Sequence, residues 1–390
     1  MATILSARGR CGEESTFTIS ALRAVGLPAR QVYTPRWAHT DDNHAWVEVW
    51  IDDRWHYMGA CEPEPVPDRG WFTEPARRAM LVHTKAFGRY NGKEPLVKRE
   101  KLFSEINALD RYAVTKDLEV TVVDSAGDQV RQADVRYLLF NYAEFYPLST
   151  VKSDINGISR FTTGIGSLLI WADDGSRYGF ALAAPQDTAV MITLSSVHSC
   201  ATINADLFAP VEPAPFPAID EQLVIQNNLL LKREDSIRQS YVNSWMNGVS
   251  AGDIASLTGI AEERIKKVLG TSMGNYRAIA SFISGSGDKA DLAIRLLEKI
   301  SEKDLRDTPE EVLNDHLASA PEKPMMMDEN FFDMYILSPM VDNEILTPFR
   351  SALKNIPGEL SGIFAAGPAH IAAWIDTAIT VTETDNYYDT

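Results

Sequence analysis

The order of hydrophobic and polar positions divides the chain into four regions with different periodicity. Residues 1–75 combine one helical segment with short aromatic strands, and residues 76–114 are interpreted as a mainly helical connector. Residues 115–232 alternate in short strands, and residues 233–390 return to helical spacing. We therefore expect an α+β protein in which a small mixed unit is followed by an antiparallel β-sandwich and a C-terminal mainly helical region.

The first region has the clearest signals for individual elements. A helix is predicted over Glu13–Val25, because Gly26-Leu27-Pro28 gives the usual stop of a glycine followed by a proline. The predicted strands that follow it are Ala29–Thr34, His44–Ile51 and Arg54–Met58. Asp52-Asp53 then forms the turn of a hairpin, which makes Ile51 face Arg54.

Later regions are predicted more coarsely. Strands are expected at Leu118–Val123, Val130–Phe140 and Arg160–Trp171, separated by turn residues, as in a sandwich of immunoglobulin-like or carboxypeptidase-regulatory-like type. Ala209–Ala218 holds four prolines and is interpreted as a linker or edge loop. In the last region, helices are predicted over Leu292–Ile300 and Pro309–Ala318.

Charge and composition narrow the classes of partner. The 390 residues carry a formal net charge of −17, which disfavours nucleic acid and anionic membrane surfaces as partners. No run of 18 apolar residues is present, so we expect no membrane span, and the first 14 residues do not have the pattern of a signal peptide. The compartment stays open between cytoplasm and export, and the oligomeric state is not predicted.

Cys11 is the first candidate for chemistry. It lies in Gly9-Arg10-Cys11-Gly12-Glu13, where a loop enters the predicted helix. The free N–H groups and the dipole at a helix N-terminus stabilise a thiolate and can bind an oxyanion. The alternative is a cysteine buried at a helix start for packing alone.

His44 is the second candidate. It opens a predicted strand directly after the polar loop Thr40–Asn43, so its ring is held firmly and stays accessible. A general base must be positioned in this way beside its nucleophile, and catalytic Cys and His residues are often far apart in sequence. The alternative is a surface-loop histidine without a role.

Several short motifs together resemble the transglutaminase-like superfamily, which includes bacterial transglutaminase-like proteins, peptide:N-glycanases and animal transglutaminases. The motifs extend over roughly residues 8–72 and are Arg10-Cys11-Gly12-Glu13, Gly26-Leu27-Pro28-Ala29-Arg30, His44-Ala45-Trp46-Val47-Glu48-Val49, Trp55 and Cys61-Glu62-Pro63. The resemblance implies a papain-like core with Cys11 as nucleophile and His44 as base. It also extends to large bacterial proteins in which a β-sandwich and helical segments follow this core.

The chain departs from the family pattern at the residue that orients the histidine. That residue is usually an Asp on the strand after the histidine, and the matching position here is Gly59. In the predicted hairpin Gly59 shares a face with His44, whereas Glu62 points to the other face. The remaining candidates for the orienting group are Glu62 after a strand break, Asp42, Glu14 or a backbone carbonyl.

A second departure concerns the start of the core. Family members normally have helices before the catalytic cysteine, whereas ten residues precede Cys11. We therefore expect the N-terminal part of the papain-like core to be missing.

Other conspicuous residues are interpreted as structural. Cys200 is expected to be a buried apolar residue, and Cys61 is left open. The tryptophans are interpreted mainly as core, with an aromatic-walled cleft as the alternative; they are Trp37, Trp46, Trp50, Trp55 and Trp71. No metal site is predicted, because His39, His44 and His56 with Asp41 and Asp42 lack ligand spacing.

Two functions from different classes follow. The first is a thiol enzyme that forms a thioester with peptide or side-chain amides and resolves it by hydrolysis or acyl transfer, with a polypeptide or glycopeptide substrate and no cofactor. The second is a binding or scaffold protein that keeps the fold but has lost the acid at Gly59. A gene fragment that folds without a function is a third possibility.

Overall fold

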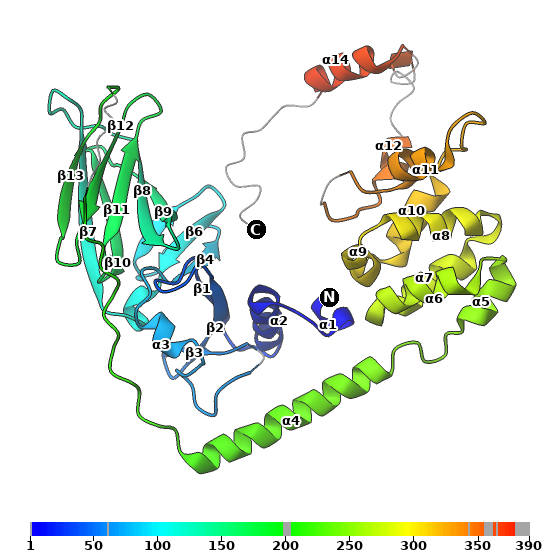
Figure 1. The fold of residues 1–390 in the computed structure, drawn as a ribbon, viewed down its shortest axis with the longest axis horizontal. Helices are drawn as coiled ribbons and strands as arrows, with labels where there is room; N and C mark the ends of the chain where they lie inside the picture. The colour runs from blue at the N-terminus through cyan, green and yellow to red at the C-terminus, as the bar shows by residue number, and fades with distance from the viewer. Residues whose placement is uncertain are drawn as a thin grey trace. The chain divides into compact units, whose positions relative to one another are not determined.

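The structure is a computed structural model, and it describes residues 2–60, 62–197, 204–341, 344–354, 362–363 and 366–378. The protein has an α+β fold with largely antiparallel sheets and a C-terminal helical region (Figure 1). Two compact units divide the chain. One contains residues 8–237, and the other contains residues 1–7 with residues 238–390.

A six-stranded sheet forms the base of the larger unit. Its strands run in the order β3-β2-β1-β4-β6-β5. Their bounds are β1 (Ala29–Thr34), β2 (His44–Ile51), β3 (Arg54–Met58), β4 (His83–Phe87), β5 (Leu96–Arg99) and β6 (Phe103–Asn107). The helix α2 (Cys11–Ala24) packs on β1 and β2, and the short helix α3 (Thr73–Ala76) and the 3-10 turn η1 (Leu109–Arg111) complete this part.

The predictions for the first region hold closely. The first three strands have the predicted bounds, and Ile51 pairs with Arg54 as the hairpin prediction required. α2 begins two residues earlier than predicted, which makes Cys11 its first helical residue. β3 ends at Met58, so Gly59 lies beyond the paired part of the hairpin.

The prediction of a mainly helical connector over 76–114 is wrong for the segment that forms β4, β5 and β6. Each of these strands is short, and β4 pairs with β1 at one position, Tyr33 with His83. Pairing with a strand 50 residues away decides their conformation, and such pairing leaves little trace in local periodicity.

Two further sheets pack around a shared apolar core in the same unit. The three-stranded sheet has the order β10-β7-β13 and the four-stranded sheet has the order β12-β11-β8-β9. Their strands are β7 (Thr115–Val123), β8 (Asp134–Asn141), β9 (Glu144–Lys152), β10 (Ile158–Gly164), β11 (Leu168–Asp173), β12 (Tyr178–Ala183) and β13 (Ala189–Thr193). The predicted single strand Arg160–Trp171 is thus two strands, because the chain turns through Ile165-Gly166-Ser167 and enters the other sheet.

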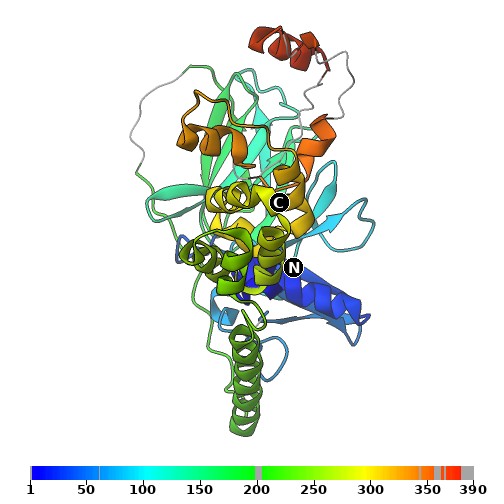
Figure 2. The same cartoon turned by 90° about the vertical axis from the view of Figure 1, so that its right-hand side faces the viewer.

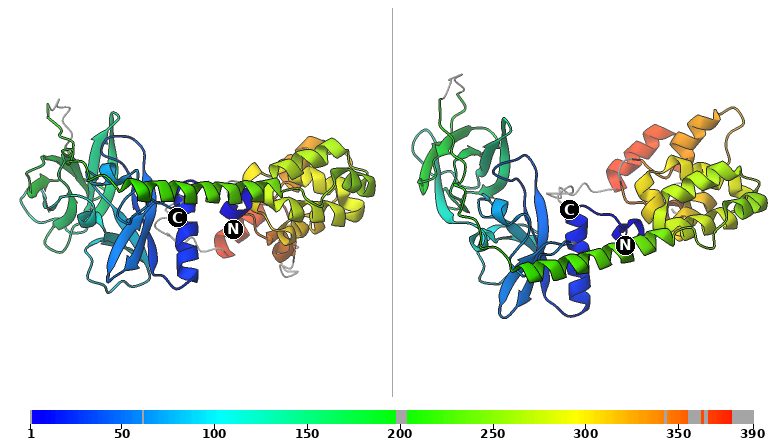
Figure 3. Two further views of the ribbon diagram at one scale, coloured as in Figure 1. Left: turned by 90° about the horizontal axis from the view of Figure 1, so that it is seen from below. Right: turned by 60° about the horizontal axis from the view of Figure 1, so that its bottom comes forward.

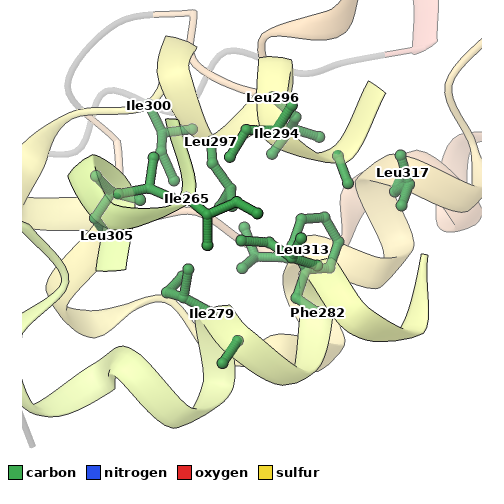
Figure 4. Packing of buried hydrophobic residues seen from close by; sticks show 14 of the residues in the cluster. Ile265, Ile279, Phe282, Ile294, Leu296, Leu297, Ile300, Leu305, Leu313 and Leu317 are labelled. Atoms are coloured by element: carbon green, nitrogen blue, oxygen red, sulfur yellow. The ribbon is translucent and has the colours of Figure 1, made fainter. Parts of the chain in front are cut away.

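The second unit is helical and has its own core, which Figure 4 shows from close by. Its apolar residues recur at helical spacing; in α8 (Ala290–Lys299) the buried ones include Ala293, Ile294 and Leu297. The other helices described there are α1 (Ala2–Ser6), α5 (Ala251–Thr258), α6 (Glu262–Thr271), α7 (Tyr276–Gly285), α9 (Glu302–Asp307), α10 (Glu310–Ala318), α11 (Glu329–Phe332), α12 (Phe349–Lys354) and α14 (Pro368–Ala378).

The helix α4 (Glu221–Asn243) is a single rod of 23 residues, visible in Figures 2 and 3, and none of its residues is buried. No helix in the described ranges is both long enough and apolar enough to cross a membrane. The proposed division at residues 75, 114 and 232 stays a prediction.

Candidate functional site

Cys11 lies at the first position of α2, the position predicted to activate a thiol. It is a free, half-buried cysteine. The backbone N–H of Arg10 donates to the Glu13 carboxylate (2.9 Å), so the helix start is fixed by a local hydrogen bond. The unpaired N–H groups of this first turn are the feature that can stabilise a thiolate or an oxyanion. Cys61 and Cys200 lie outside the described residues.

Polar and apolar contacts fasten α2 to one face of the sheet. The buried hydroxyl of Ser15 donates to the carbonyl of Cys11 and accepts from the amide Nε2 of Gln31 on β1 (2.7 Å). Ile19 packs with Ala29 of β1 and Val47 of β2. We call this side of the sheet the α2 face.

The direction of α2 places Cys11 at one end of the sheet. Arg23 Nε donates to the carbonyl of Ala29, and Ser15, further back along the helix, is level with Gln31. Cys11 is four residues before Ser15, so it lies about 6 Å further along the helix axis at 1.5 Å per residue. It is therefore near the level of Tyr33, which pairs with Ala45, the neighbour of His44.

His44 begins β2 at this same end, but its ring lies on the opposite face of the sheet. Side chains alternate along a strand, and Val47 contacts α2 while Trp46 contacts Phe72 and Tyr112. The His44 ring lies with Trp46 against the rings of Phe72 (4.9 Å between centroids) and Trp71 (4.5 Å). We call this side the aromatic face.

The surroundings of His44 are largely apolar. Its residue is 9% exposed, and burial lowers the pKa of its imidazole to about 4 despite the nearby charge of Asp42. Among the described residues, no hydrogen bond joins His44 to Cys11, to Asp42 or to any other group. The prediction that Cys11 and His44 act as a pair therefore stays a prediction.

Two of the other candidates for an orienting carboxylate lie beside α2. Thr18 Oγ1 donates to the carbonyl of Ala60 (3.0 Å), which holds the loop after β3 against this helix. Burial, then the charges of Glu62 and Glu13, raise the pKa of Glu14, so Glu14 and Glu62 are close to each other. Of the carboxylate candidates, Glu14 and Glu62 thus lie near α2, whereas Asp42 is near the His44 ring.

The backbone at Gly59 explains why a side chain is not easily accommodated there. A Cβ at this position would come within 2.9 Å of the carbonyl oxygen of Glu62. The loop turns back on itself directly after β3, so an Asp at position 59 requires the backbone to move. The position that holds an Asp in the family pattern is thus a glycine here, and the backbone leaves no room for a side chain in this conformation.

The tryptophans divide between packing and exposure. Trp37 and Trp46 are buried in a cluster with Phe72, as the interpretation as core residues predicted. Trp71, by contrast, is 58% exposed although its ring touches His44. The aromatic face thus has an exposed indole at the edge of the His44 site.

A buried charge network on the aromatic face was not singled out from the sequence. Glu48 is 1% exposed, and its carboxylate accepts from Arg30 (2.7 Å), Arg111 (2.9 Å) and the hydroxyl of Tyr112 (2.7 Å). Glu94 accepts from both arginines, at 2.7 and 3.0 Å. Arg30 and Glu48 are direct cross-strand partners, a signal that the strand prediction already contained.

The proline-rich segment Ala209–Ala218 is fastened beside α3. The ring of Phe216 makes cation–π contacts with the guanidinium groups of Arg69 (4.1 Å from the ring centroid) and Arg77 (4.4 Å). The same arginines donate to the carbonyls of Pro217 (3.0 Å) and Ala214 (2.6 Å). The predicted linker or edge loop is therefore held in place by specific contacts.

No metal site is apparent in the part of the chain that the structure describes, since no group of three or more His, Cys, Asp or Glu is placed to hold an ion. His56 on β3 was one of the residues considered for a metal site. Its Nδ1 contacts Asp68 (2.8 Å), and its Nε2 accepts from Arg54 (2.9 Å). Both of its ring nitrogens are thus occupied by protein groups.

Comparison with known proteins gives one informative match. A search of curated proteins finds none that matches. A solved structure of a streptococcal ancillary pilin aligns at 8% identity with a TM-score of 0.20, over 46% of this chain and 65% of that chain, less than two thirds of its length. A similarity this low carries no argument about fold. The family model of the transglutaminase-like superfamily matches residues 1–60. The resemblance predicted from the sequence is thereby confirmed for residues 1–60, which are similar to the transglutaminase-like superfamily.

Proposed function

We propose that this protein is a transglutaminase-like thiol enzyme with Cys11 as its nucleophile. The observation that carries the proposal is the position of Cys11: a free, half-buried thiol at the first residue of a 14-residue helix, inside the segment that matches the family. A thiolate at a helix N-terminus has nearby N–H groups for the oxyanion that forms when it attacks a carbonyl. The substrate class is a peptide bond or the side-chain amide of Gln or Asn, in a polypeptide or glycopeptide.

The reaction proceeds in two steps. Cys11 Sγ gives its proton to an imidazole and attacks the amide carbon, and collapse of the tetrahedral intermediate breaks the C–N bond while the imidazolium protonates the leaving amine. Water or a second amine then attacks the thioester, which gives a carboxylic acid or a new amide and restores the thiol. The family resemblance proposes His44 as that imidazole.

The second candidate is a catalytically impaired binding or scaffold protein. It is favoured by the closed backbone at Gly59 and by the apolar surroundings of His44, to which no carboxylate is hydrogen-bonded among the described residues. Loss of the orienting acid in triad enzymes reduces the rate by large factors without abolishing all catalysis.

Alkylation and turnover together separate the two candidates. Iodoacetamide at pH 6, followed by peptide mass mapping, measures the reactivity of Cys11 apart from that of Cys61 and Cys200. Hydroxylamine with a library of glutamine-containing peptides reports thioester formation as hydroxamate. The enzyme predicts rapid modification of Cys11 and hydroxamate formation that is lost in Cys11→Ser. Slow modification of Cys11, with no hydroxamate above the Cys11→Ser level, would rule out the enzyme and favour the binding or scaffold protein.

A further inference from the structure

The four-stranded sheet β12-β11-β8-β9 has aromatic rings on the surface that faces away from its core. Side chains alternate along a strand, and Tyr137 of β8 and Ile170 and Ala172 of β11 are fully buried in that core. Their neighbours along each strand therefore point outward, together with the residues of β12 that pair with them. We call this side the outer sheet surface; its central residues are Asp134, Arg136, Trp171, Asp173, Tyr178 and Phe180.

The other sheet around the same core has an outward surface of the ordinary kind. On β7 the outward residues are Asp117, Glu119 and Thr121. Glu119 forms an exposed ion pair with Arg160 of β10 (3.0 Å). Such residues suit contact with water, as is usual for an antiparallel sheet with one solvated face. The ring of Phe180, which is 44% exposed, departs from this pattern, so contact with water alone does not explain the outer sheet surface.

Three rings on the outer sheet surface have nearly the same orientation. The ring of Trp171 lies 4.5 Å from that of Tyr178, with 16° between their planes, and 6.3 Å from that of Phe180, with 5° between their planes. Phe180 pairs directly with Trp171 across β12 and β11, and Tyr178 is two residues earlier on β12. Partly exposed aromatic rings offer apolar faces on which a flat apolar group can stack.

Carboxylates and cations border these rings and are paired with one another. Asp173 accepts from the indole Nε1 of Trp171 (3.2 Å) and contacts the guanidinium group of Arg136 (3.1 Å). Asp134, the cross-strand partner of Asp173, accepts from Lys152 (2.7 Å). The four charges sum to zero, although the chain carries a formal net charge of −17. The side chains of Arg136 and Lys152 are 46% and 57% exposed, so both can also donate to a ligand.

The size of the outer sheet surface limits the kind of partner. Its apolar part continues beyond the rings in half-buried leucines and a phenylalanine pair, namely Leu182, Leu169 and Leu138, then Phe140 and Phe145. Even the whole surface, four strands at about 4.8 Å spacing and about seven residues at about 3.4 Å, covers roughly 450 Å². Specific protein–protein interfaces bury about 800 Å² per partner. The surface is therefore small for a folded partner or a second copy of the chain, and large enough for a short oligomeric ligand.

We propose that the outer sheet surface binds a neutral oligosaccharide. A sugar ring has a side made of C–H groups, which stacks on an aromatic ring, and a rim of hydroxyls that both donate and accept hydrogen bonds. The rings of Trp171, Tyr178 and Phe180 provide the stacking surface. Arg136 donates to the hydroxyls and Asp134 accepts from them. Because the charges of this surface are already balanced, a neutral ligand fits it better than an ionic one. The inference does not depend on Cys11 or on the proposed function.

Isothermal titration calorimetry on the full chain tests the proposal. The probes are hexasaccharides derived from cellulose, starch, xylan, mannan and chitin. We expect at least one of them to bind with a Kd of about 1 mM or below, and to bind Cys11→Ser equally well. Trp171→Ala and Phe180→Ala should each weaken binding by about tenfold. Phe87→Ala is the matched control, because Phe87 is an 80% exposed ring on β4 of the six-stranded sheet, and it should bind as the parent does.

Several outcomes would overturn the proposal. One is the absence of binding to all five probes, and another is binding that Trp171→Ala and Phe180→Ala leave unchanged. Sedimentation of the parent and of Trp171→Ala tests a second copy as the occupant: self-association that this substitution abolishes, without sugar binding, assigns the surface to a dimer. Titration with a proline-rich peptide tests a polypeptide in the same way. Thermal unfolding of each variant checks that the loss of an exposed ring leaves the fold intact.

A second measurement uses the parent protein and needs no loss of binding in a variant. The indole N–H signal of Trp171 is followed by NMR during titration with the sugar, and is identified by its absence from Trp171→Phe. Because this N–H donates to Asp173 beside the stacking surface, its signal should move with the midpoint that calorimetry gives. The indole of Trp46, which is buried and donates to Tyr112 (2.9 Å), should not move. A stationary Trp171 signal at saturating sugar would refute the assignment of the site.

Discussion

The two faces of the six-stranded sheet contain similar residues and use them differently. On the aromatic face, Glu48 accepts hydrogen bonds from two arginines and a tyrosine, so its charge is balanced from several sides. On the α2 face, His83 has one carboxylate neighbour, and its Nε2 has no hydrogen-bond partner among the residues that the structure describes. A satisfied network stabilises a fold, whereas a buried polar atom without a hydrogen-bond partner is costly.

The same contrast separates the histidines. His56 has both ring nitrogens engaged by side chains, and His44 is surrounded by aromatic rings. His83 alone of these three combines a carboxylate with a free Nε2. The comparison teaches that histidines of one sheet differ in their surroundings: side chains hold His56, aromatic rings surround His44, and one carboxylate contacts His83.

The largest expected effect tests whether the aromatic face is structural. Glu48→Gln removes the negative charge shared by Arg30 and Arg111 and leaves both guanidinium groups undercompensated in a buried setting. We expect the free energy of unfolding of this unit to fall by about 3–5 kcal/mol. Urea denaturation followed by tryptophan fluorescence measures the change.

The control for this variant is an exposed ion pair in the same unit. Glu119 pairs with Arg160 at 3.0 Å, with both side chains well exposed. Glu119→Gln should therefore cost less than about 1 kcal/mol. Equal effects of the two substitutions would mean that burial does not distinguish the Glu48 network.

The next effect concerns the pH dependence of stability. The pKa of His44 is about 4 in the folded chain and about 6.5 when unfolded, so between these values the unfolded state binds the proton and the folded state does not. The contribution of His44 to the free energy of unfolding is thus fully present well above pH 6.5. It declines as the pH falls toward 4, by up to about 3 kcal/mol. His44→Phe should flatten this part of the curve, measured as unfolding free energy against pH.

Subtracting the two curves removes the contribution of the carboxylates, which titrate in both proteins, and leaves that of His44. The difference between parent and His44→Phe should change between pH 6.5 and 4 and stay constant above 7. Parallel curves over the whole range would show that His44 is not held in its neutral form by burial.

On the α2 face, the first turn of the helix depends on Ser15. Its hydroxyl donates to the Cys11 carbonyl and accepts from Gln31 (2.7 Å), and the residue is fully buried. Ser15→Ala should destabilise the unit by about 1–2 kcal/mol, because the amide of Gln31 loses a buried acceptor. It should also change the alkylation rate of Cys11, since the helix start is less well fixed.

Ser20 provides the matched control on the same helix. It is exposed, and its hydroxyl bonds to the carbonyl of Thr16 (2.8 Å) within the helix. Ser20→Ala should stay within about 0.5 kcal/mol of the parent. If both variants alkylate alike, Ser15 does not position the thiol.

The sequence predicts the local elements of the site well and its assembly poorly. α2 and β1–β3 follow from periodicity, and the hairpin register follows from the Asp52-Asp53 turn. β4 and β6 do not, because strands of five residues depend on partners elsewhere in the chain.

The buried pair of His83 and Glu105 was missed for the same reason. His83 and Glu105 are 22 positions apart, in a segment interpreted as helical, and strand pairing brings them together. If residues 83–87 and 103–107 had been predicted as paired strands, both side chains would have been placed on one face. The absence of the acid at Gly59 was visible in the sequence, but the backbone that closes this position was not.

The smallest expected effect concerns the proline-rich segment beside the aromatic face. Phe216→Ala removes the ring that contacts Arg69 and Arg77. Because each cation–π contact near the surface contributes about 0.5–1 kcal/mol, we expect a loss of roughly 1 kcal/mol, with faster proteolytic cleavage within residues 209–217. Phe208→Ala is the control, because Phe208 directly precedes this segment, is also exposed, and is held through its backbone by Ser167. Equal cleavage of the two variants would show that the arginine pair does not hold the segment. Faster cleavage of Phe216→Ala with unchanged Cys11 alkylation would separate the aromatic face from the chemistry, as the comparison of the two faces requires.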